Sequence, residues 1–250
     1  MVESDPVQLV AERLAASTLT VVLTGSGTSA ESGVPTFRDA QTGLWAKYRP
    51  EDLATPAAFA QNPQFVWDWY QWRRGIIADV QPNAGHRALA ELARRVTALT
   101  LITQNVDGLH QRAGSDHVIE FHGNIMRSKC SVQGCGVEVD LTDDTSPPRC
   151  PDCGGALRPD VVWFGEPIPP AALESALQAV ADCDVMLVAG TSAQVQPAAS
   201  LAEVAKERGA CLVEINPEST PLTAIADFVL AGPSGRVLPA LVNALGSQNA

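Results

Sequence analysis

A glycine-rich turn after a short apolar run is the feature that most constrains how this chain can fold. The apolar run covers residues 19–23, and its length predicts a buried strand. Gly25 and Gly27 follow it, where they let the backbone bend sharply and approach a pyrophosphate closely. Free N–H groups at the start of a following helix would bind the phosphate charge. The G-x-G-x-x-A spacing, which Ala30 completes, predicts a nucleotide site, although an ordinary strand-to-helix turn looks similar.

The residues after this turn depart from an ordinary dinucleotide-binding fold. Such a fold continues into a helix and then a second strand, which ends in an acidic residue about 20 residues later. Here Pro35 interrupts the pattern, Phe37 and Arg38 follow in a predicted loop, and no strand-like run occurs before Leu99. The sequence therefore predicts an insertion directly over the nucleotide site, and it disfavours an ordinary dehydrogenase.

Apolar runs alternate with helical patterns through most of the chain. The expected strands after the first cover residues 99–103, 117–121, 184–189, 211–215 and 227–230. The expected helices of this part cover residues 7–16, 83–96, 171–181 and 197–208. This alternation predicts an α/β fold with a parallel sheet covered on both faces. Residues 40–80 are rich in aromatics and contain two helix starts of the cap-then-proline type, so they predict a helical insertion.

Length, charge and hydropathy narrow the class of protein. The 250 residues allow one large domain and a small insertion, and the formal charge is −11. Stable nucleic-acid binding needs a basic surface, so we expect no nucleic-acid partner. The acidic balance suits a basic peptide partner, and it equally suits a solubilising surface. No apolar run approaches a membrane span and the N-terminus does not resemble a signal peptide, so we expect a cytoplasmic monomer without a membrane partner.

Four of the six cysteines form a compact set. Cys130 and Cys135 make the first pair, and Cys150 and Cys153 make the second after a gap of 14 residues. Two such pairs supply the four thiolates that a tetrahedral structural Zn²⁺ needs. Two disulfides are the alternative, which a cytoplasmic location disfavours. The spacing therefore predicts one structural zinc with a closed coordination sphere.

Several motifs together resemble the sirtuins, which are NAD-dependent protein-lysine deacylases. The matching segments occur in the family's order, and they are residues 25–38, 104–107, 122–123, the four cysteines, 161–166, 190–192 and 216. The resemblance implies an α/β fold whose Rossmann-like NAD-binding domain is formed by residues 1–38, 81–124 and 158–250. It also implies a small lobe, in which a helical insertion of residues 39–80 joins a zinc-binding ribbon of residues 125–157.

The resemblance implies that NAD lies between the lobes and is consumed, which accounts for the unusual loop at Pro35. The implied NAD-binding residues are Gly25, Ser26, Gly27, Thr28, Ala30, Phe37, Arg38, Trp45, Gln104, Asn105, Asp107, Gly190, Thr191, Ser192, Asn216, Pro217, Glu218 and Ser234. Two of them depart from the family, which usually has Ala at position 26 and an aliphatic residue at position 28. Both replacements are small and polar, so we expect NAD binding to be kept. The first cysteine pair is spaced by four residues rather than two, which still suits zinc.

His122 is implied as the catalytic base. Nicotinamide is a cationic leaving group, so the acyl oxygen of a modified lysine can attack the ribose when it is held in place and water is excluded. A base must then activate a ribose hydroxyl, and histidine titrates near working pH. Taken alone, His122 is equally compatible with a hydrogen-bonded residue at a strand end. The substrate peptide is implied to pair, as an added strand, with Val162, Trp163, Phe164 and Gly165.

Three residues of the helical insertion bear on the acyl group. Tyr70 and Arg73 stand three positions apart on one face of a predicted helix, and Ala54 lies upstream. This set resembles the class III sirtuins, in which the pair reads succinyl, malonyl or glutaryl chains. A planar guanidinium suits a carboxylate, the phenol adds a hydroxyl, and the small Ala54 leaves room. On composition alone, the alternative is a packed Tyr70 and a solvated Arg73.

The expected function is transfer of the acyl group from lysine to ADP-ribose with release of nicotinamide, for succinyl, malonyl and acetyl groups. Two alternatives stay open at this point. The chain could be mainly a deacetylase or an ADP-ribosyltransferase that uses the same site. It could also be a non-catalytic module that binds acylated peptides together with NAD and zinc.

Overall fold

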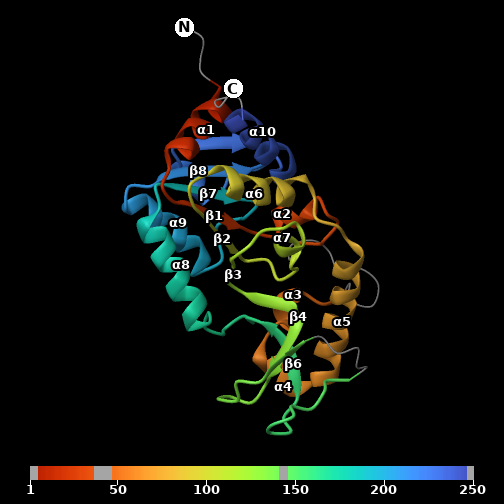
Figure 1. Ribbon diagram of the computed structural model, residues 1–250. Helices are drawn as coiled ribbons and strands as arrows, with labels where there is room; N and C mark the ends of the chain where they lie inside the picture. The colour runs from red at the N-terminus through yellow and green to blue at the C-terminus, as the bar shows by residue number, and fades with distance from the viewer. Residues whose placement is uncertain (1–4, 37–46, 141–145, 247–250) are drawn as a thin grey trace.

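Two β-sheets organise the chain, as Figure 1 shows. The computed structural model describes residues 5–36, 47–140 and 146–246. The larger sheet has six strands in the order β3-β2-β1-β7-β8-β9, and every neighbouring pair is parallel. Its strands are β1 (Thr20–Thr24), β2 (Leu99–Thr103), β3 (Val118–Glu120), β7 (Val185–Ala189), β8 (Cys211–Asn216) and β9 (Phe228–Ala231). This confirms the predicted α/β class with a parallel sheet.

The strand order reverses direction between β1 and β7. From β1 the chain continues outward through β2 and β3, and it then returns to the other side of β1 to form β7, β8 and β9. Connections to the left and right of such a reversal leave a crevice at the carboxyl ends of the two central strands. Ligands of open α/β sheets bind at this crevice. The glycine-rich turn directly follows β1, so the topology places it at the switch point.

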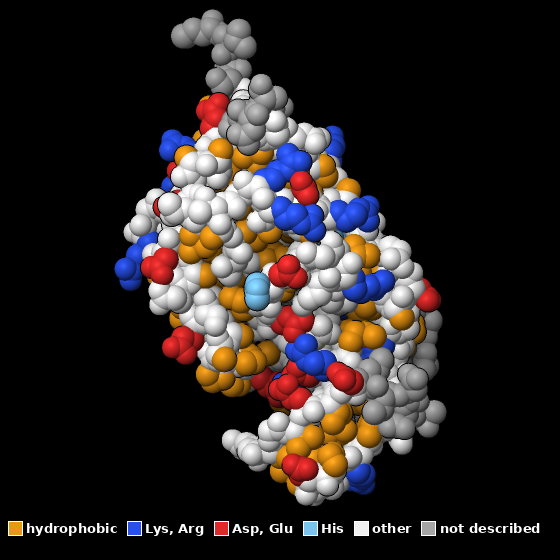
Figure 2. Space-filling view, in the orientation of Figure 1, with side chains coloured by type: hydrophobic (Ala, Val, Ile, Leu, Met, Phe, Trp, Pro, Cys, Tyr) orange, Lys and Arg blue, Asp and Glu red, His pale blue; other side chains and the backbone are white. Residues whose placement is uncertain are grey.

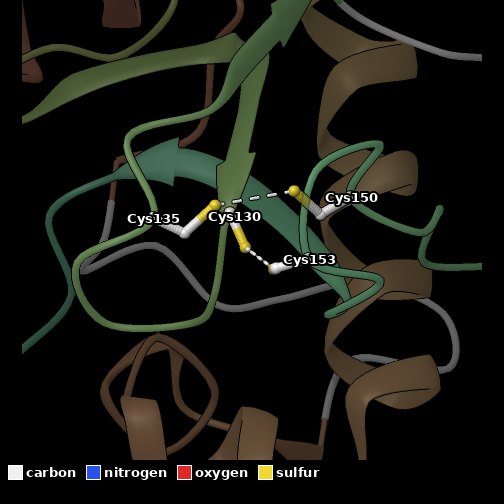
Figure 3. A group of neighbouring side chains, drawn as sticks. All are labelled: Cys130, Cys135, Cys150 and Cys153. Atoms are coloured by element: carbon white, nitrogen blue, oxygen red, sulfur yellow. Dashed lines mark hydrogen bonds between the residues drawn. The ribbon is translucent and has the colours of Figure 1, made fainter.

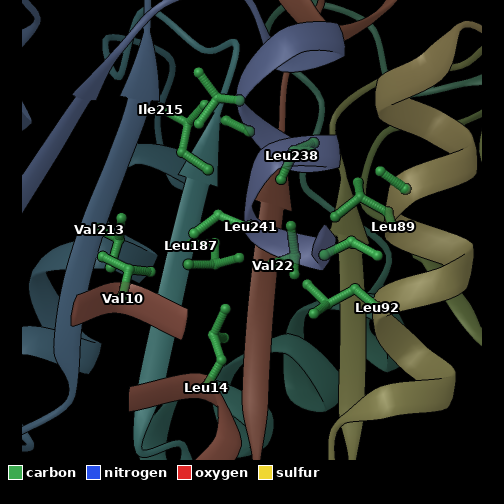
Figure 4. Packing of buried hydrophobic residues seen from close by; sticks show 14 of the residues in the cluster. Val10, Leu14, Val22, Leu89, Leu92, Leu187, Val213, Ile215, Leu238 and Leu241 are labelled. Atoms are coloured by element: carbon green, nitrogen blue, oxygen red, sulfur yellow. The ribbon is translucent and has the colours of Figure 1, made fainter. Parts of the chain in front are cut away.

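Helices cover both faces of the larger sheet. One face packs against α1 (Pro6–Ala16), α6 (Ala84–Arg95) and α10 (Ser234–Gly246), and the other packs against α8 (Pro170–Asp182) and α9 (Ala198–Glu207). Figure 4 shows the first interface, where Leu14, Leu89 and Leu241 meet the sheet. Alternate side chains of a strand point to opposite faces, so Val22 faces these helices while Val21 and Leu23 face the second core. Each leucine buried in this way contributes about 1.5–3 kcal/mol.

The second sheet and a group of helices form the lower part of the molecule in Figure 1. The sheet is antiparallel in the order β5-β4-β6, with strands β5 (Glu138–Asp140), β4 (Gly123–Cys130) and β6 (Leu157–Val161). The helices are α3 (Pro50–Leu53), α4 (Pro56–Gln61) and α5 (Pro63–Asp79). The expected caps are present, because the side chain of Thr55 accepts from Ala58 N and that of Asn62 accepts from Phe65 N.

Three short helical turns complete the described elements, namely α2 (Gly27–Ala30), α7 (Leu109–Arg112) and the 3₁₀ turn η2 (Pro221–Ala224). The boundaries expected for the larger sheet agree with the structure within one or two residues. The strands of the smaller sheet were not predicted from the sequence, because β4 and β6 contain few apolar residues among polar ones and a proline, and β5 has only three residues. None of the described helices is long and apolar enough to cross a membrane.

Candidate active site

The loops that follow β1 and β7 touch each other through their backbones. Gly27 N donates to Gly190 O at 2.8 Å, and Gly25 N donates to Ala189 O at 3.1 Å. A Cβ atom on Gly27 would lie 2.7 Å from Gly190 O, so no side chain fits at that position. The result is a cradle in which the two loops pack backbone against backbone at the switch point, where dinucleotides bind in folds of this kind. This cradle is the first feature that fits the NAD implied by the sequence.

Polar groups from the ends of three strands, β2, β7 and β8, meet around Thr191. Gln104 Nε2, after β2, donates to Thr191 Oγ1 at 3.1 Å. Asn216 Nδ2, at the end of β8, donates to Thr191 O at 2.9 Å. Gly190 N donates to Ile215 O at 3.0 Å, which ties β7 to β8. The structure therefore brings together Gln104, Gly190, Thr191 and Asn216, four of the residues proposed for NAD.

A buried hydrogen-bond network fixes Asn105 and Asp107 behind the glycine loop. Ser29 Oγ donates its single proton to Asp107 Oδ2 at 2.7 Å. Ser29 Oγ must therefore act as the acceptor in its second bond, which it forms with Asn105 Nδ2 at 3.0 Å. Thr28 Oγ1 donates to Gly25 O at 2.7 Å and accepts the second Asn105 proton at 3.0 Å. The direction of every bond is thereby fixed. Both protons of the Asn105 amide face the loop, and its carbonyl oxygen is the group left for a ligand.

The sequence analysis singled out neither Ser29 nor His86, two buried residues of this network. Ser29 is 1% exposed, and its hydroxyl bonds both Asn105 and Asp107 in the loop after β2. His86 Nε2 lies 3.3 Å from Ser29 Oγ, and His86 Nδ1 accepts from Asn83 N at 3.3 Å. Burial raises the pKa of Asp107, whereas Leu109 N and Ser29 Oγ lower it by donating to the carboxylate. A serine in a small-residue loop carries no distinctive sequence signal, so only its contacts reveal it.

His122 follows β3 and is half-buried at the edge of this network. Its Nδ1 lies 3.1 Å from Gln104 O, and a carbonyl oxygen can only accept. The proton therefore sits on Nδ1, and Nε2 carries the lone pair that a general base needs. Burial lowers the pKa of His122 from its usual value, and the bond to Gln104 opposes this shift. The imidazole is neutral at pH 7 and ready to accept a proton.

The segment from Val162 to Glu166 connects β6 to α8 and is held as a tight turn. Val162 N donates to His122 O and Phe164 N donates to Ala54 O, both at 2.9 Å. Trp163 N donates to Glu166 Oε2 and Glu166 N donates to Trp163 O, also at 2.9 Å. Gly165 N is the remaining backbone donor of the segment, and both Phe164 and Gly165 are exposed. Figure 2 shows the surface hollowed between the two lobes, and the connection to α8 borders this hollow.

Tyr70 and Arg73 lie on α5 and are both buried, which excludes a solvated Arg73. Trp163 Nε1 donates to Tyr70 Oη at 2.8 Å, and the Arg73 guanidinium lies 5.3 Å from the centroid of Trp69. Desolvation raises the pKa of Tyr70 to about 12. Arg73 also lines a small cavity with Val34 and Pro35 of the loop after the glycine turn. Ala54 is 4% exposed and belongs to the same buried cluster as Tyr70, and Tyr70 lies one helical turn from Arg73 on α5.

The four cysteines of the small lobe converge, as Figure 3 shows. Their sulfur atoms all lie within 4.8 Å of one another, with Cys130 and Cys153 at 3.5 Å and Cys135 and Cys150 at 3.6 Å. A tetrahedral Zn²⁺ with bonds of about 2.3 Å separates its sulfurs by about 3.8 Å, whereas a disulfide needs about 2.05 Å. The four thiols are free, so the donor set fits a structural zinc and not two disulfides.

The other residues proposed for NAD differ in their exposure, and three of them lie outside the described residues, namely Phe37, Arg38 and Trp45. Ser26 precedes α2 without a side-chain cap bond, and Ala30, Pro217 and Glu218 are exposed. Ser192 follows Thr191 and is half-buried. Ser234 at the start of α10 is 3% exposed, and its buried hydroxyl has no partner among the described residues, so a ligand atom could satisfy it.

Known proteins resemble this chain over almost its whole length. An NAD-dependent protein deacylase of Ralstonia nicotianae is 55% identical over 223 residues, which cover 89% of this chain and 90% of the relative. A solved Sir2 homologue in complex with NAD has a TM-score of 0.92 at 47% identity, over 99% of this chain and 96% of that one. A solved Sir2 protein with a p53 peptide and NAD⁺ has a TM-score of 0.84 at 31% identity, over 96% and 98%.

The sequence pattern of the Sir2 family matches residues 25–197, which run from the glycine-rich turn to the loop after β7. This match spans more than half of the chain and includes the backbone cradle, His122 and the four cysteines. The similarity in sequence and the similarity in structure agree. The chain therefore belongs to the Sir2 family.

Proposed function

We propose that this chain is an NAD-dependent protein-lysine deacylase that removes succinyl and malonyl groups in preference to acetyl groups. Family membership and relatives named as NAD-dependent protein deacylases support the general activity. The solved relatives that hold NAD, or NAD⁺ with a p53 peptide, support NAD as the co-substrate and an acylated protein or peptide as the substrate. The preference for acidic acyl groups rests on the Tyr70 and Arg73 pair alone.

The residues around the switch point fit NAD. The backbone cradle of Gly25, Gly27 and Gly190 lies where the pyrophosphate would bind, and the unpartnered hydroxyl of Ser234 offers a hydrogen bond to the cofactor. When bound, NAD supplies an activated ribose that accepts the acyl group as nicotinamide leaves. The free carbonyl oxygen of Asn105 is a fixed acceptor for a ribose hydroxyl, and the Ser29 bond keeps Asp107 in place beside it.

His122 performs the proton transfer in this proposal. Its Nδ1–H bond to Gln104 O holds the ring and selects the tautomer, so Nε2 is the atom that accepts a proton from a ribose hydroxyl. The neighbouring backbone of His122 accepts from Val162 N, which links the base to the segment proposed for the peptide. Base and peptide segment are therefore positioned by the same strand pair, β4 and β6.

One observation carries the acyl preference: a guanidinium and a phenol are buried together beside the cofactor loop. Burial of a cation is costly, and Arg73 is only 7% exposed. Desolvation lowers the pKa of Arg73, and the nearby Tyr70 and Asp107 only partly oppose this shift. A succinyl or malonyl carboxylate would pair with the planar guanidinium fork and accept from the Tyr70 hydroxyl. An acetyl group makes neither interaction.

The test is a mass-spectrometric deacylation assay with one peptide that carries acetyl-, malonyl- or succinyl-lysine. Replacing Arg73→Met keeps a side chain like the apolar stem of arginine but removes the charged guanidinium. We expect kcat/KM for the succinyl peptide to fall about 10- to 100-fold, because a hydrogen bond to a charged group is worth roughly 1.5–3 kcal/mol. The acetyl reaction should fall much less.

Two controls make this assay decisive. Arg94→Met changes an arginine whose side chain is 64% exposed on α6, so it should alter none of the three reactions. Nicotinamide release should depend on the acylated peptide, which separates deacylation from ADP-ribosyl transfer to other acceptors. Fastest removal of acetyl by the wild type, together with no change of preference in Arg73→Met, would refute the proposed acyl preference.

A further inference from the structure

We infer that Trp163, clamped by Arg158 and Glu166, is a positioning residue that aims the Tyr70 hydroxyl proton at the carboxylate of the acyl chain. This inference rests on the proposed function, since it concerns how the same pocket recognises an acidic acyl group. The sequence resemblance placed Trp163 among the residues that pair with the peptide backbone. The structure gives its side chain a separate task, because the ring is 2% exposed and points into the core of the small lobe.

The direction of one hydrogen bond carries the argument. An indole N–H can only donate, so Tyr70 Oη must accept from Trp163 Nε1 at 2.8 Å. This bond occupies an acceptor position of the hydroxyl and leaves its own proton for another partner. No other partner of that hydroxyl is found among the described residues. The Tyr70 proton is therefore oriented away from Trp163 and kept for an acceptor that enters the pocket.

Trp163 itself is immobilised from two sides. The Arg158 guanidinium lies over the indole, with its central carbon 3.2 Å from the ring centroid. Arg158 Nη2 donates to Glu166 Oε2 at 2.9 Å and to Val161 O at 2.7 Å. Glu166 Oε2 also accepts from Trp163 N at 2.9 Å. One ion pair thus closes the turn and presses on the ring at the same time.

The clamp joins two parts of the proposed substrate site. Trp163 belongs to the turn that borders the hollow between the lobes, and Tyr70 belongs to α5, which carries Arg73. A hydroxyl held in one orientation loses little rotational freedom when it donates to a carboxylate, so the bond forms at lower entropic cost. Without the clamp, the phenol proton has no fixed direction. The preference for an acidic acyl group should then weaken even though Tyr70 and Arg73 are both intact.

The first test compares Trp163→Phe with the wild type on acetyl- and succinyl-lysine versions of one peptide. Phenylalanine keeps an aromatic ring over Arg158 and removes only the Nε1 donor and part of the ring. We expect KM for the succinyl peptide to rise about tenfold more than KM for the acetyl peptide, since one oriented hydrogen bond is worth about a factor of ten. A loss of packing alone would affect both peptides equally.

A double-mutant cycle with Tyr70→Phe provides the matched control. If Trp163 acts through the Tyr70 hydroxyl, Trp163→Phe should cause no further change of the succinyl-to-acetyl ratio once that hydroxyl is absent. Independent, additive effects of the two changes on this ratio would overturn the inference. So would an equal loss on both peptides in the single Trp163→Phe variant.

A second variant covers the case in which Trp163→Phe does not fold. Glu166→Gln keeps the size of the side chain but removes the charge that pairs with Arg158. Because this loosens the clamp without removing the indole donor, we expect half of the free-energy effect of Trp163→Phe, which is a fall of about threefold in the preference for the succinyl over the acetyl peptide. An unchanged ratio would overturn the inference. The outcome with Arg73→Met separates the two proposals. If Arg73→Met changes the preference and the clamp variants do not, the inference fails and the proposed function stands.

Discussion

Mild acid should destabilise this protein through two buried histidines, His86 and His110. Their rings lie 4.7 Å apart between centroids, and both are 1% exposed. Thr24 Oγ1 donates to Thr103, so it accepts from His110 Nε2 and leaves His110 Nδ1 buried without a donor or acceptor among the described residues. His86 Nδ1 already accepts from Asn83 N. A second proton on either ring would have no acceptor, so the folded state keeps both neutral.

The magnitude follows from the pKa shifts. Desolvation lowers the pKa of His86 to about 4 and that of His110 to about 3, from an ordinary value of 6.5. The unfolded chain therefore binds more protons below pH 6.5, and stability falls as the pH falls through that value towards the folded pKa. Between pH 7.5 and pH 5.5 each histidine lowers the free energy of unfolding by about 1.4 kcal/mol, which gives about 3 kcal/mol for the pair.

The assay is urea unfolding at pH 7.5 and at pH 5.5, with a constant m-value as the check for two-state behaviour. The free energy of unfolding of His110→Phe should fall by about 1.4 kcal/mol less than that of the wild type over this pH interval, because one of the two histidines is gone. The difference between variants cancels the contributions of His122 and Asp107, which titrate in both. His117→Asn alters an exposed histidine and should leave the loss unchanged. If the free energy of unfolding of His110→Phe falls as much as that of the wild type, the reasoning is refuted.

Two further predictions concern the cofactor loop and the metal. Ser29→Ala removes the hydroxyl that donates to Asp107 Oδ2 and accepts from Asn105 Nδ2, so the Kd for NAD in calorimetry should rise about tenfold, and an unchanged Kd would show that this hydroxyl does not position Asn105. A strong chelator should release about one Zn²⁺ per chain, measured with a metallochromic dye, and should lower the Tm; Cys135→Ser should bind much less zinc, and full zinc retention in that variant would contradict the four-cysteine site.

Much of the fold was predictable because its signals are local. The buried strands of the larger sheet read as apolar runs, and the caps at Thr55 and Asn62 are set by residues three positions away. The four cysteines report a metal site through spacing alone, since two close pairs of thiolates supply the four ligands of a tetrahedral zinc. The smaller sheet escaped prediction because β4 and β6 carry polar residues and a proline where a buried strand usually has apolar ones, and because β5 has only three residues.

The residue types of the candidate site were also readable, but their partners were not. The sequence by itself determined a strand and glycine turn, a strand-end histidine, a cysteine quartet, and a tyrosine and an arginine on one helix face. Only the tertiary structure decided that Ser29 donates to Asp107, 78 positions away, and that Trp163 donates to Tyr70, 93 positions away. Periodicity reports which side of an element is buried, whereas pairing between distant elements depends on strand order and on which donors are left unsatisfied when the sheets assemble.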